Sequence, residues 1–248
     1  EALADASRRR AQINTLSVYT LSDGKKFARS ERVTISIEEN KTGRIRLSFI
    51  EDEIDGYGDQ WRAAAWVSSL MAVDLTGADP TKIQIEFERS GRVDGPSAGG
   101  LTTIGILAAL RGDEVRADAA MTGSINPDGT IGPVGGVPHK IDGAVNAGMK
   151  LVLIPYGSRV ERDSNTGKEV DLFARGRDQG IEVKAVGDIY AAYKLMTGKE
   201  LPRPAAAQSP ELDDELYGRI KIKIDEWLLR ATEYKKRYQR VPVRYQTG

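Results

Sequence analysis

The 248-residue chain has no cysteine, a single histidine and no long apolar run, and each absence excludes a class of site or protein. Without cysteine there are no disulfides, no thiolate nucleophiles and no cysteine-ligated metals. His139 as the only histidine excludes a zinc site built from several imidazoles. Because no uninterrupted apolar stretch approaches about 18 residues, we expect no transmembrane helix.

An excess of charge of one sign is also missing. The chain has 36 basic and 36 acidic residues, so its formal net charge is zero. Nucleic acids and anionic membranes attract proteins with a basic excess, and the balance therefore favours neither as the partner. No G-x-x-x-x-G-K-[ST] phosphate-binding loop occurs, and the sequence indicates no cofactor and no metal. The chain begins with Glu1, which is compatible with a cytoplasmic protein or with an exported one that has lost a leader.

Composition and periodicity divide the chain into four segments. We expect a flexible N-terminal segment at 1–12, a folded domain at 13–197, a Pro-rich linker at 198–210 and a helical extension at 211–248. Apolar residues in the extension recur at spacings of about four among many charges. This pattern is typical of a helix that packs on its own domain or against another subunit.

The folded domain mixes strand and helix patterns. Alternating apolar and polar residues predict strands at 13–20, 32–39, 43–50 and 82–88, and short apolar runs predict strands at 151–154 and 181–186. Helical spacing predicts helices at 59–75, 97–110, 137–147, 169–179 and 188–196. Glycines and prolines among short apolar runs predict tight turns and strands at 118–137, and 157–168 is expected to be a polar loop. The turn residues 40–43 predict that 32–39 and 43–50 form an antiparallel hairpin. Together these elements predict an α+β fold in which helices pack on mixed sheets.

The segment VDGPSAGG, residues 93–100, places a serine between glycines just ahead of an apolar helix. Pro96 restricts the backbone before Ser97, and small neighbours leave space around the Ser97 hydroxyl. In the first turn of a helix, unpaired backbone N–H groups favour a developing anion, so the position suits a nucleophile beside an oxyanion site. It equally suits a serine that only caps the helix, and the octapeptide alone does not separate the two.

A serine nucleophile needs a general base, and two adjacent residues compete for that role. His139 is the only imidazole, while Lys140 lies beside the apolar stripe of Val137 and Ile141. Neighbouring helical side chains point about 100° apart, so both cannot face one serine. An apolar surrounding lowers the pKa of a lysine, and the neutral amine can then accept a proton. We expect His139 at the rim of the site, and a Lys140 that extends to solvent is the structural alternative.

Residues 94–155 resemble the proteolytic domain of the Lon family of serine proteases. The resemblance rests on DGPSAG (94–99), VRADAAMTG (115–123), DGTIGPVGGV (128–137), Lys140 and GMKLVLIP (148–155). The 43 positions between Ser97 and Lys140 match the family's spacing for a Ser-Lys dyad. The match covers about a quarter of the chain.

The resemblance implies a role for each matching residue. Ser97 is the expected nucleophile, Lys140 the expected general base, and Thr122 the threonine whose hydroxyl orients the lysine amine. The backbone N–H groups of Gly95 and Ser97 are expected near the oxyanion, and Asp94 at the mouth of the site. Ser124 departs from the family pattern, which usually has at this position an acidic residue that packs between subunits.

These roles imply a serine endopeptidase that acts on unfolded or flexible polypeptides. The family also implies a homo-oligomeric ring, a hexamer by default. Because no ATPase motif is present, we expect either ATP-independent cleavage by this chain as it stands or a separate ATPase or adaptor partner. Two alternatives stay open: a catalytically silent, RadA-type ring scaffold that binds nucleic acid or a protein, and a self-processing Ser-Lys endopeptidase that cuts within 198–210.

Overall fold

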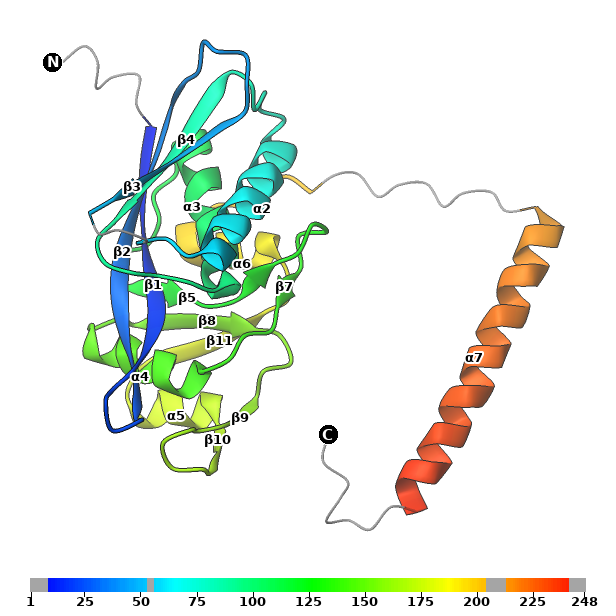
Figure 1. Cartoon of the computed structure of the whole chain (residues 1–248). Coiled ribbons are helices and arrows are strands. Elements are labelled where there is room, and N and C mark those ends of the chain that lie inside the picture. The colour runs from blue at the N-terminus through cyan, green and yellow to red at the C-terminus, as the bar shows by residue number, and fades with distance from the viewer. Residues whose placement is uncertain (1–8, 53–55, 204–212, 241–248) are drawn as a thin grey trace, which may run out of the picture. The chain divides into compact units, whose positions relative to one another are not determined.

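The computed structural model describes residues 9–52, 56–203 and 213–240, and the chain divides into two compact units after Arg203. The first unit combines several sheets with packed helices, which confirms the predicted α+β class (Figure 1). The division falls inside the stretch 198–210 that was predicted as a linker. Residues 1–8 and 204–212, which hold most of the expected flexible segment and linker, lie outside the described residues, as do 241–248.

The larger sheet has four strands in the order β1-β2-β4-β3. Their bounds are Arg9–Thr20 for β1, Lys26–Glu39 for β2, Arg46–Glu51 for β3 and Ile83–Arg89 for β4. β1 and β2 form an antiparallel hairpin, β2 pairs antiparallel with β4, and β3 runs parallel to β4. Residues 9–12 therefore belong to a strand, and their predicted looseness is wrong.

The predicted hairpin between 32–39 and 43–50 is wrong, because β4 lies between β2 and β3. The turn after β2 does form: the Asn40 side chain accepts from the Thr42 N–H and donates to the Arg44 carbonyl. The Asn40 backbone N–H, however, donates to the carbonyl of Lys82, next to β4. Turn residues specify a local reversal, whereas the partner of β2 is decided by which strand buries the most apolar surface against it.

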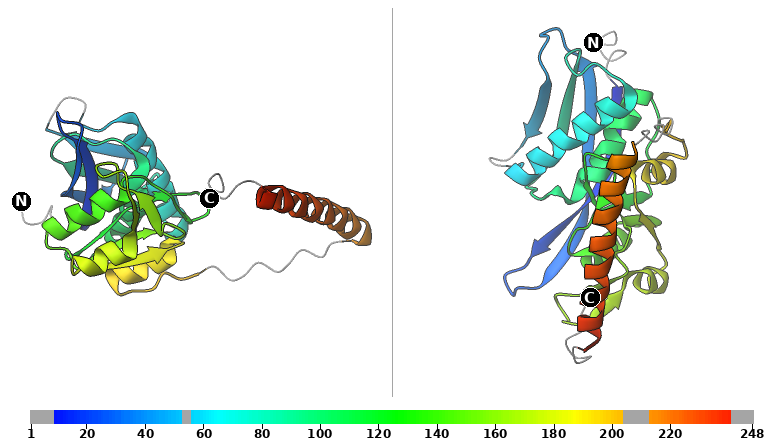
Figure 2. Two further views of the ribbon diagram at one scale, coloured as in Figure 1. Left: turned by 90° about the horizontal axis from the view of Figure 1, so that it is seen from below. Right: turned by 90° about the vertical axis from the view of Figure 1, so that its right-hand side faces the viewer.

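Two helices cover one face of this sheet, α2 (Asp59–Thr76) and α3 (Gly99–Arg111) (Figures 1 and 2). Trp61 of α2 packs edge-on against Phe87 of β4, with ring centroids 5.5 Å apart. Eleven residues of α3 are buried, because the helix has neighbours on all sides. α2 ends at Gly77, as predicted, with its φ of 66° in the left-handed region that glycine tolerates.

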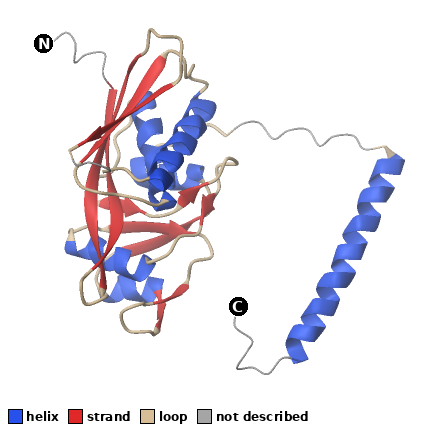
Figure 3. Ribbon diagram, viewed as in Figure 1, coloured by secondary structure: helices blue, strands red, loops and turns tan. Residues whose placement is uncertain are grey.

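A second sheet of three parallel strands has the order β11-β8-β5. The strands are β5 (Ala119–Met121), β8 (Leu151–Pro155) and β11 (Glu182–Val186). Helices α4 (Val137–Asn146) and α5 (Leu172–Asp178) pack on one face, and α3 and α6 (Ile189–Thr197) lie on the other (Figure 3). Leu151 and Leu153 point into the core beside α3, whereas Val152 and Ile154 point towards α4. Burial on both faces explains why β8 is apolar throughout.

Short elements complete the first unit. A 3-10 turn, η1 (Pro96–Ala98), precedes α3, and β6 (Ser124–Ile125) pairs with β7 (Ile131–Gly132). The stretch predicted as polar loop and helix instead forms a hairpin of β9 (Val160–Arg162) and β10 (Glu169–Asp171). α5 begins only at Leu172, because the Asp171 side chain accepts from two backbone N–H groups and so caps the helix there.

The second unit contains helix α7 (Asp214–Arg240), which confirms a helix in the C-terminal extension. None of its residues is buried within the described structure. Its exposed apolar side chains include Ile220, Ile224, Trp227 and Leu228. Within the described ranges, none of the helices combines the length and apolar character needed to span a bilayer.

Candidate active site

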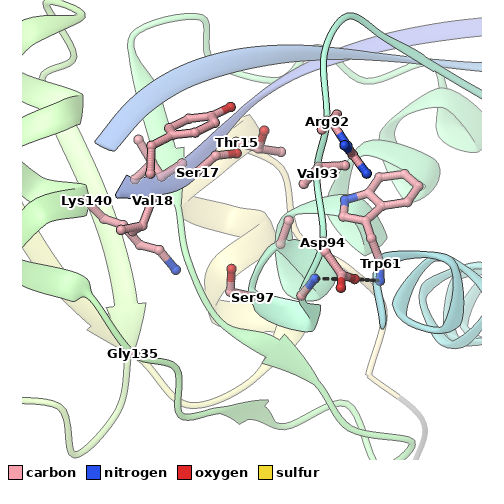
Figure 4. Close-up of a pocket in the computed structure, with 14 residues that line it drawn as sticks. Thr15, Ser17, Val18, Trp61, Arg92, Val93, Asp94, Ser97, Gly135 and Lys140 are labelled. Atoms are coloured by element: carbon pink, nitrogen blue, oxygen red, sulfur yellow. Dashed lines mark hydrogen bonds between the residues drawn. The ribbon is translucent and has the colours of Figure 1, made fainter. Parts of the chain in front are cut away.

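Ser97 and Lys140 line one cavity of about 220 Å³ in the first unit. Its wall also includes residues 15–19 of β1, Trp61 of α2 and the loop around Asp94. Figure 4 shows the Lys140 side chain extending towards Ser97, with its amine and the Ser97 hydroxyl facing the same space. Two residues 43 positions apart in the sequence therefore face the same cavity.

Ser97 lies in η1, two residues before α3 itself begins. Gly95 before it has a φ of 96°, which L side chains rarely adopt, and Pro96 opens the turn. The Ser97 carbonyl accepts from the backbone N–H of Gly123 at 2.7 Å, which anchors the loop to the segment after β5. The N-cap residue of α3 is Ala98 and no side chain caps the helix start, so the reading of Ser97 as a helix cap is wrong.

The two glycines after Ser97 are explained by close helix packing, whereas from the sequence we expected them to leave space around the Ser97 hydroxyl. A Cβ at Gly100 would lie 2.6 Å from the Met121 Cε, and one at Gly99 would lie 3.0 Å from the Ile125 backbone nitrogen. Both glycines are buried. They allow α3 to approach β5 and β6 closely, and this contact holds the Ser97 turn in place.

Lys140 is buried, with 3% of its surface exposed, so the alternative in which it extends to solvent is wrong. Its Nζ donates to the Thr122 Oγ1 at 2.9 Å, and the same hydroxyl donates to the Ser97 carbonyl at 3.3 Å. Burial lowers the pKa of Lys140 from 10.5 to about 8, although the negative charge of Glu161 acts in the opposite direction. A substantial fraction of the amine is therefore neutral in mildly alkaline solution.

His139 is buried rather than at the rim of the site, so that expectation is wrong. Its Nε2 lies 2.9 Å from the Ser164 Oγ and 4.0 Å from the Asp163 carboxylate, on the side of the β9–β10 hairpin. It does not line the cavity, whereas Lys140 does. The helix rotation that separates the two side chains thus brings only the lysine to Ser97.

Asp94 lines the cavity and also holds its wall together. Its Oδ1 accepts from the backbone N–H groups of Gly95, Gln60 and Trp61 at 2.8, 3.0 and 3.2 Å. The carboxylate therefore joins the Ser97 loop to the first turn of α2, where backbone donors lack partners within the helix. The N–H of Gly95, expected near the oxyanion, donates to this carboxylate.

Sequence reasoning missed Glu161, which lies on β9 and contacts the start of α4. Its two carboxylate oxygens accept from the backbone N–H groups of Gly136 and Val137. One signal for its hairpin was present, because the turn-forming residues at 163–167 stand between two short segments that each contain a valine. No grouping of three or more His, Asp or Glu side chains that could hold a metal ion occurs among the described residues.

Comparison with known proteins agrees with this geometry. Residues 76–171, which include Ser97, Thr122, Lys140 and Glu161, match the Lon protease (S16) C-terminal proteolytic domain family. The chain carries a Lon-family proteolytic domain. It is 30% identical to Lon protease 2 of Bacillus subtilis over 208 residues, which are 80% of this chain and 34% of that protein. It is 28% identical to the archaeal Lon protease of Archaeoglobus fulgidus over 195 residues, which are 77% of this chain and 29% of that protein.

A shorter match is closer in sequence. The Lon protease of Desulfovibrio desulfuricans is 49% identical over 63 residues, which are 25% of this chain and 7% of that protein. The chain thus spans about a third or less of the length of these Lon proteases. The segment that matches the family contains Ser97 and Lys140 of the cavity lining, whereas residues 15–19, Trp61 and α7 lie outside it.

Proposed function

We propose that this Lon-type domain is a serine endopeptidase in which Ser97 and Lys140 act as a Ser-Lys dyad. The observation that carries the proposal is a buried lysine of lowered pKa that faces Ser97 across a cavity. A neutral amine in that position can accept the serine proton without a histidine. Ser97 then attacks the peptide carbonyl, and the proton passes to the Lys140 Nζ.

The remaining steps use the same groups. Lys140 returns the proton to the leaving amine as the peptide C–N bond breaks, which leaves an acyl ester on Ser97. Water then attacks the ester with Lys140 again as the base, and the ester oxygen regains a proton as Ser97. The negative oxygen formed in each attack is stabilised by backbone N–H groups of the η1 turn, with that of Ser97 as the first candidate.

Thr122 orients the base through the polarity of its two hydrogen bonds. Its hydroxyl proton is directed to the Ser97 carbonyl, so its oxygen is left to accept from Lys140. When Lys140 is neutral, one N–H is used in that bond, and the amine lone pair is free to point elsewhere. Thr122 thereby favours a lysine rotamer that presents the lone pair towards Ser97.

The shape of the site supports an extended, unfolded polypeptide as the substrate. β1 is an edge strand of its sheet, and its residues 15–19 border the cavity. A peptide can add to such an edge through backbone hydrogen bonds, with alternate side chains in the cavity. The proposal includes cleavage without ATP by the chain as it stands, and assembly into a homo-oligomer, with a separate ATPase or adaptor as the alternative route to substrates.

Cleavage of a fluorescently labelled unfolded protein, without nucleotide, tests the proposal. We expect the native chain to cut and the Ser97→Ala and Lys140→Met variants not to cut. Ser22→Ala is the matched control, because Ser22 is exposed in the turn between β1 and β2 and does not line the cavity. A fluorophosphonate probe read by intact mass should label the native chain once and Ser97→Ala not at all.

Each of the other possible outcomes contradicts one part of the proposed function. Equal cleavage by the native chain and Ser97→Ala would refute the dyad. If the probe labels Ser97 but no protein is cut without ATP, the ATP-independent part is wrong. The absence of both labelling and cleavage would favour the silent RadA-type scaffold. A loss of mass that corresponds to cleavage within 198–210 in the purified chain would favour self-processing.

A further inference from the structure

The β9–β10 hairpin contacts the first turn of α4, the helix that carries Lys140. Glu161 Oε1 accepts from the Gly136 N–H at 2.7 Å, and Oε2 accepts from the Val137 N–H at 3.3 Å. The first N–H groups of a helix have no partner within it, and the positive end of the helix dipole favours a carboxylate there. Glu161 therefore stabilises the start of α4 by hydrogen bonding and by charge.

A single residue, Gly136, connects Glu161 with Lys140 through the backbone. The N–H of Gly136 donates to Glu161, and its carbonyl accepts the backbone N–H of Lys140 at 3.1 Å. Gly136 has a φ of 73°, a conformation that suits glycine and lets the chain turn into the helix. A shift of the Glu161 carboxylate would thus be transmitted through one residue to the backbone of the lysine.

Further contacts keep the hairpin in one position relative to α4. Ser164 bonds to His139, and Asp163 lies 3.4 Å from the Arg175 guanidinium, which also binds Asp142 of α4. Asn165 forms two hydrogen bonds with the backbone of Lys26, which is the first residue of β2. The carboxylate of Glu161 is consequently presented to the helix from a fixed support.

We propose that Glu161 is a positioning residue for the dyad, whose carboxylate fixes the first turn of the Lys140 helix and supplies the negative charge that the buried amine senses. The inference rests on the proposed role of Lys140 as the general base. It also goes beyond that role, because it assigns the control of the base to a residue outside the cavity lining.

Most of the other titratable groups around α4 and the cavity have a hydrogen-bond or ion-pair partner. On α4 itself, His139 is bonded to Ser164 and Asp142 to Arg175 of α5; Asp163 of the hairpin loop also lies near Arg175. Across the cavity, Tyr19 of β1 donates to Glu31 of β2, and Glu31 forms an ion pair with Arg89. Asp94 accepts three backbone N–H groups. Arg92 also lines the cavity. Glu161 is the carboxylate whose charge raises the pKa of Lys140 against the effect of burial.

The sign of the effect follows from this opposition. A negative charge stabilises the protonated amine, so its removal lowers the pKa of Lys140 below the present value of about 8. Glu161→Gln removes the charge and keeps one oxygen that can accept from Gly136, although its NH2 group cannot accept from Val137. Glu161→Ala removes both the charge and the hydrogen bonds.

The experiment is the rate of Ser97 labelling by a fluorophosphonate between pH 6 and 10, for the native chain and both variants. For Glu161→Gln we expect the midpoint to fall by about one pH unit, with a rate at pH 7 about fivefold higher and a plateau within about threefold of native. For Glu161→Ala we expect the same direction of shift and a lower plateau. A purely structural role predicts instead that both variants lower the plateau and leave the midpoint unchanged, which would overturn the proposal.

Glu169→Gln is the matched control, because it removes the same charge from an exposed position of the same hairpin. It should leave both midpoint and plateau unchanged, and an equal shift in this variant would refute a specific role for Glu161. A second readout does not need activity: the titration of the Lys140 side chain by NMR in ¹³C-lysine-labelled protein, assigned by its loss in Lys140→Met. A lower Lys140 pKa in Glu161→Gln without any Ser97 labelling would support the positioning role and refute the peptidase. Labelling of Ser97 with an unchanged Lys140 pKa in Glu161→Gln would support the peptidase and refute the positioning role.

Discussion

Lys140→Met should make the protein more stable at neutral pH while it abolishes the proposed activity. A lysine that is 3% exposed must be moved from water into a mostly apolar surrounding when the chain folds, and its charged form resists this. Methionine has a similar length and no charge, and it packs well in irregular apolar spaces. Active sites often contain groups that lower stability in this way.

The magnitude follows from the pKa. In the folded chain the pKa of Lys140 is about 8, against 10.5 for an exposed lysine. Each unit of difference corresponds to about 1.4 kcal/mol, so the charged lysine lowers the free energy of unfolding by on the order of 3 kcal/mol at pH 7. Because the unfolded chain binds more protons between pH 8 and 10.5, the native chain regains this stability as the pH rises through that window.

The assay is urea unfolding of the native chain and Lys140→Met at pH 7 and at pH 10.5. The advantage of the variant should be about 3 kcal/mol larger at pH 7 than at pH 10.5, and other titrating groups cancel in the comparison. Lys150→Met is the control, since the Lys150 side chain is 78% exposed and should show no such pH dependence. If the difference between Lys140→Met and native does not change with pH, the lysine is not held in a surrounding that lowers its pKa, and the argument for a neutral base fails.

Three further predictions follow from the same site. The rate of Ser97 labelling should rise about tenfold between pH 7 and 9, and a rate that is flat over this range would contradict a base with a pKa of about 8. Thr122→Val should lower that rate by about tenfold or more and Thr122→Ser should restore most of it, since only the hydroxyl accepts from Lys140. Gly143→Ala should lower the free energy of unfolding by about 2 kcal/mol or more, as measured by urea unfolding, because its Cβ would lie 2.6 Å from the Ala28 carbonyl oxygen. Gly135→Ala is the control and should not lower it, because a Cβ there meets no described atom within 4 Å.

Several elements of the fold could be predicted because their signals are local. The helix that ends at Gly77 and the apolar strand 151–155 follow from periodicity and from the residues at their ends. The partner of the strand at 32–39 could not be predicted in this way, because the sequence around the turn says nothing about β4, which lies between β2 and β3. The β9–β10 hairpin was missed because its strands have three residues each and are largely exposed, so they carry little alternation.

The candidate site shows the same division. The motif around Ser97 and the spacing to Lys140 were sufficient to choose both residues, because the resemblance to the Lon family is carried by a contiguous pattern. The sequence alone did not decide between Ser97 as a nucleophile and as a cap, or between a buried and a solvent-exposed Lys140. Those questions depend on which surfaces cover α3 and α4, and the sheet strands and the hairpin supply those surfaces.

The amino-acid sequence by itself determined the class of the fold, most of its helices and strands, and the choice of Ser97 and Lys140 as the candidate dyad. Each of these is encoded in side-chain periodicity, in turn and capping residues, or in a short motif. The tertiary structure decided which strands pair, where His139 points, how far the pKa of Lys140 falls and which carboxylate opposes that fall. These properties arise from contacts between segments far apart in the chain, and the electrostatics of a buried amine depend on every group that replaces water around it.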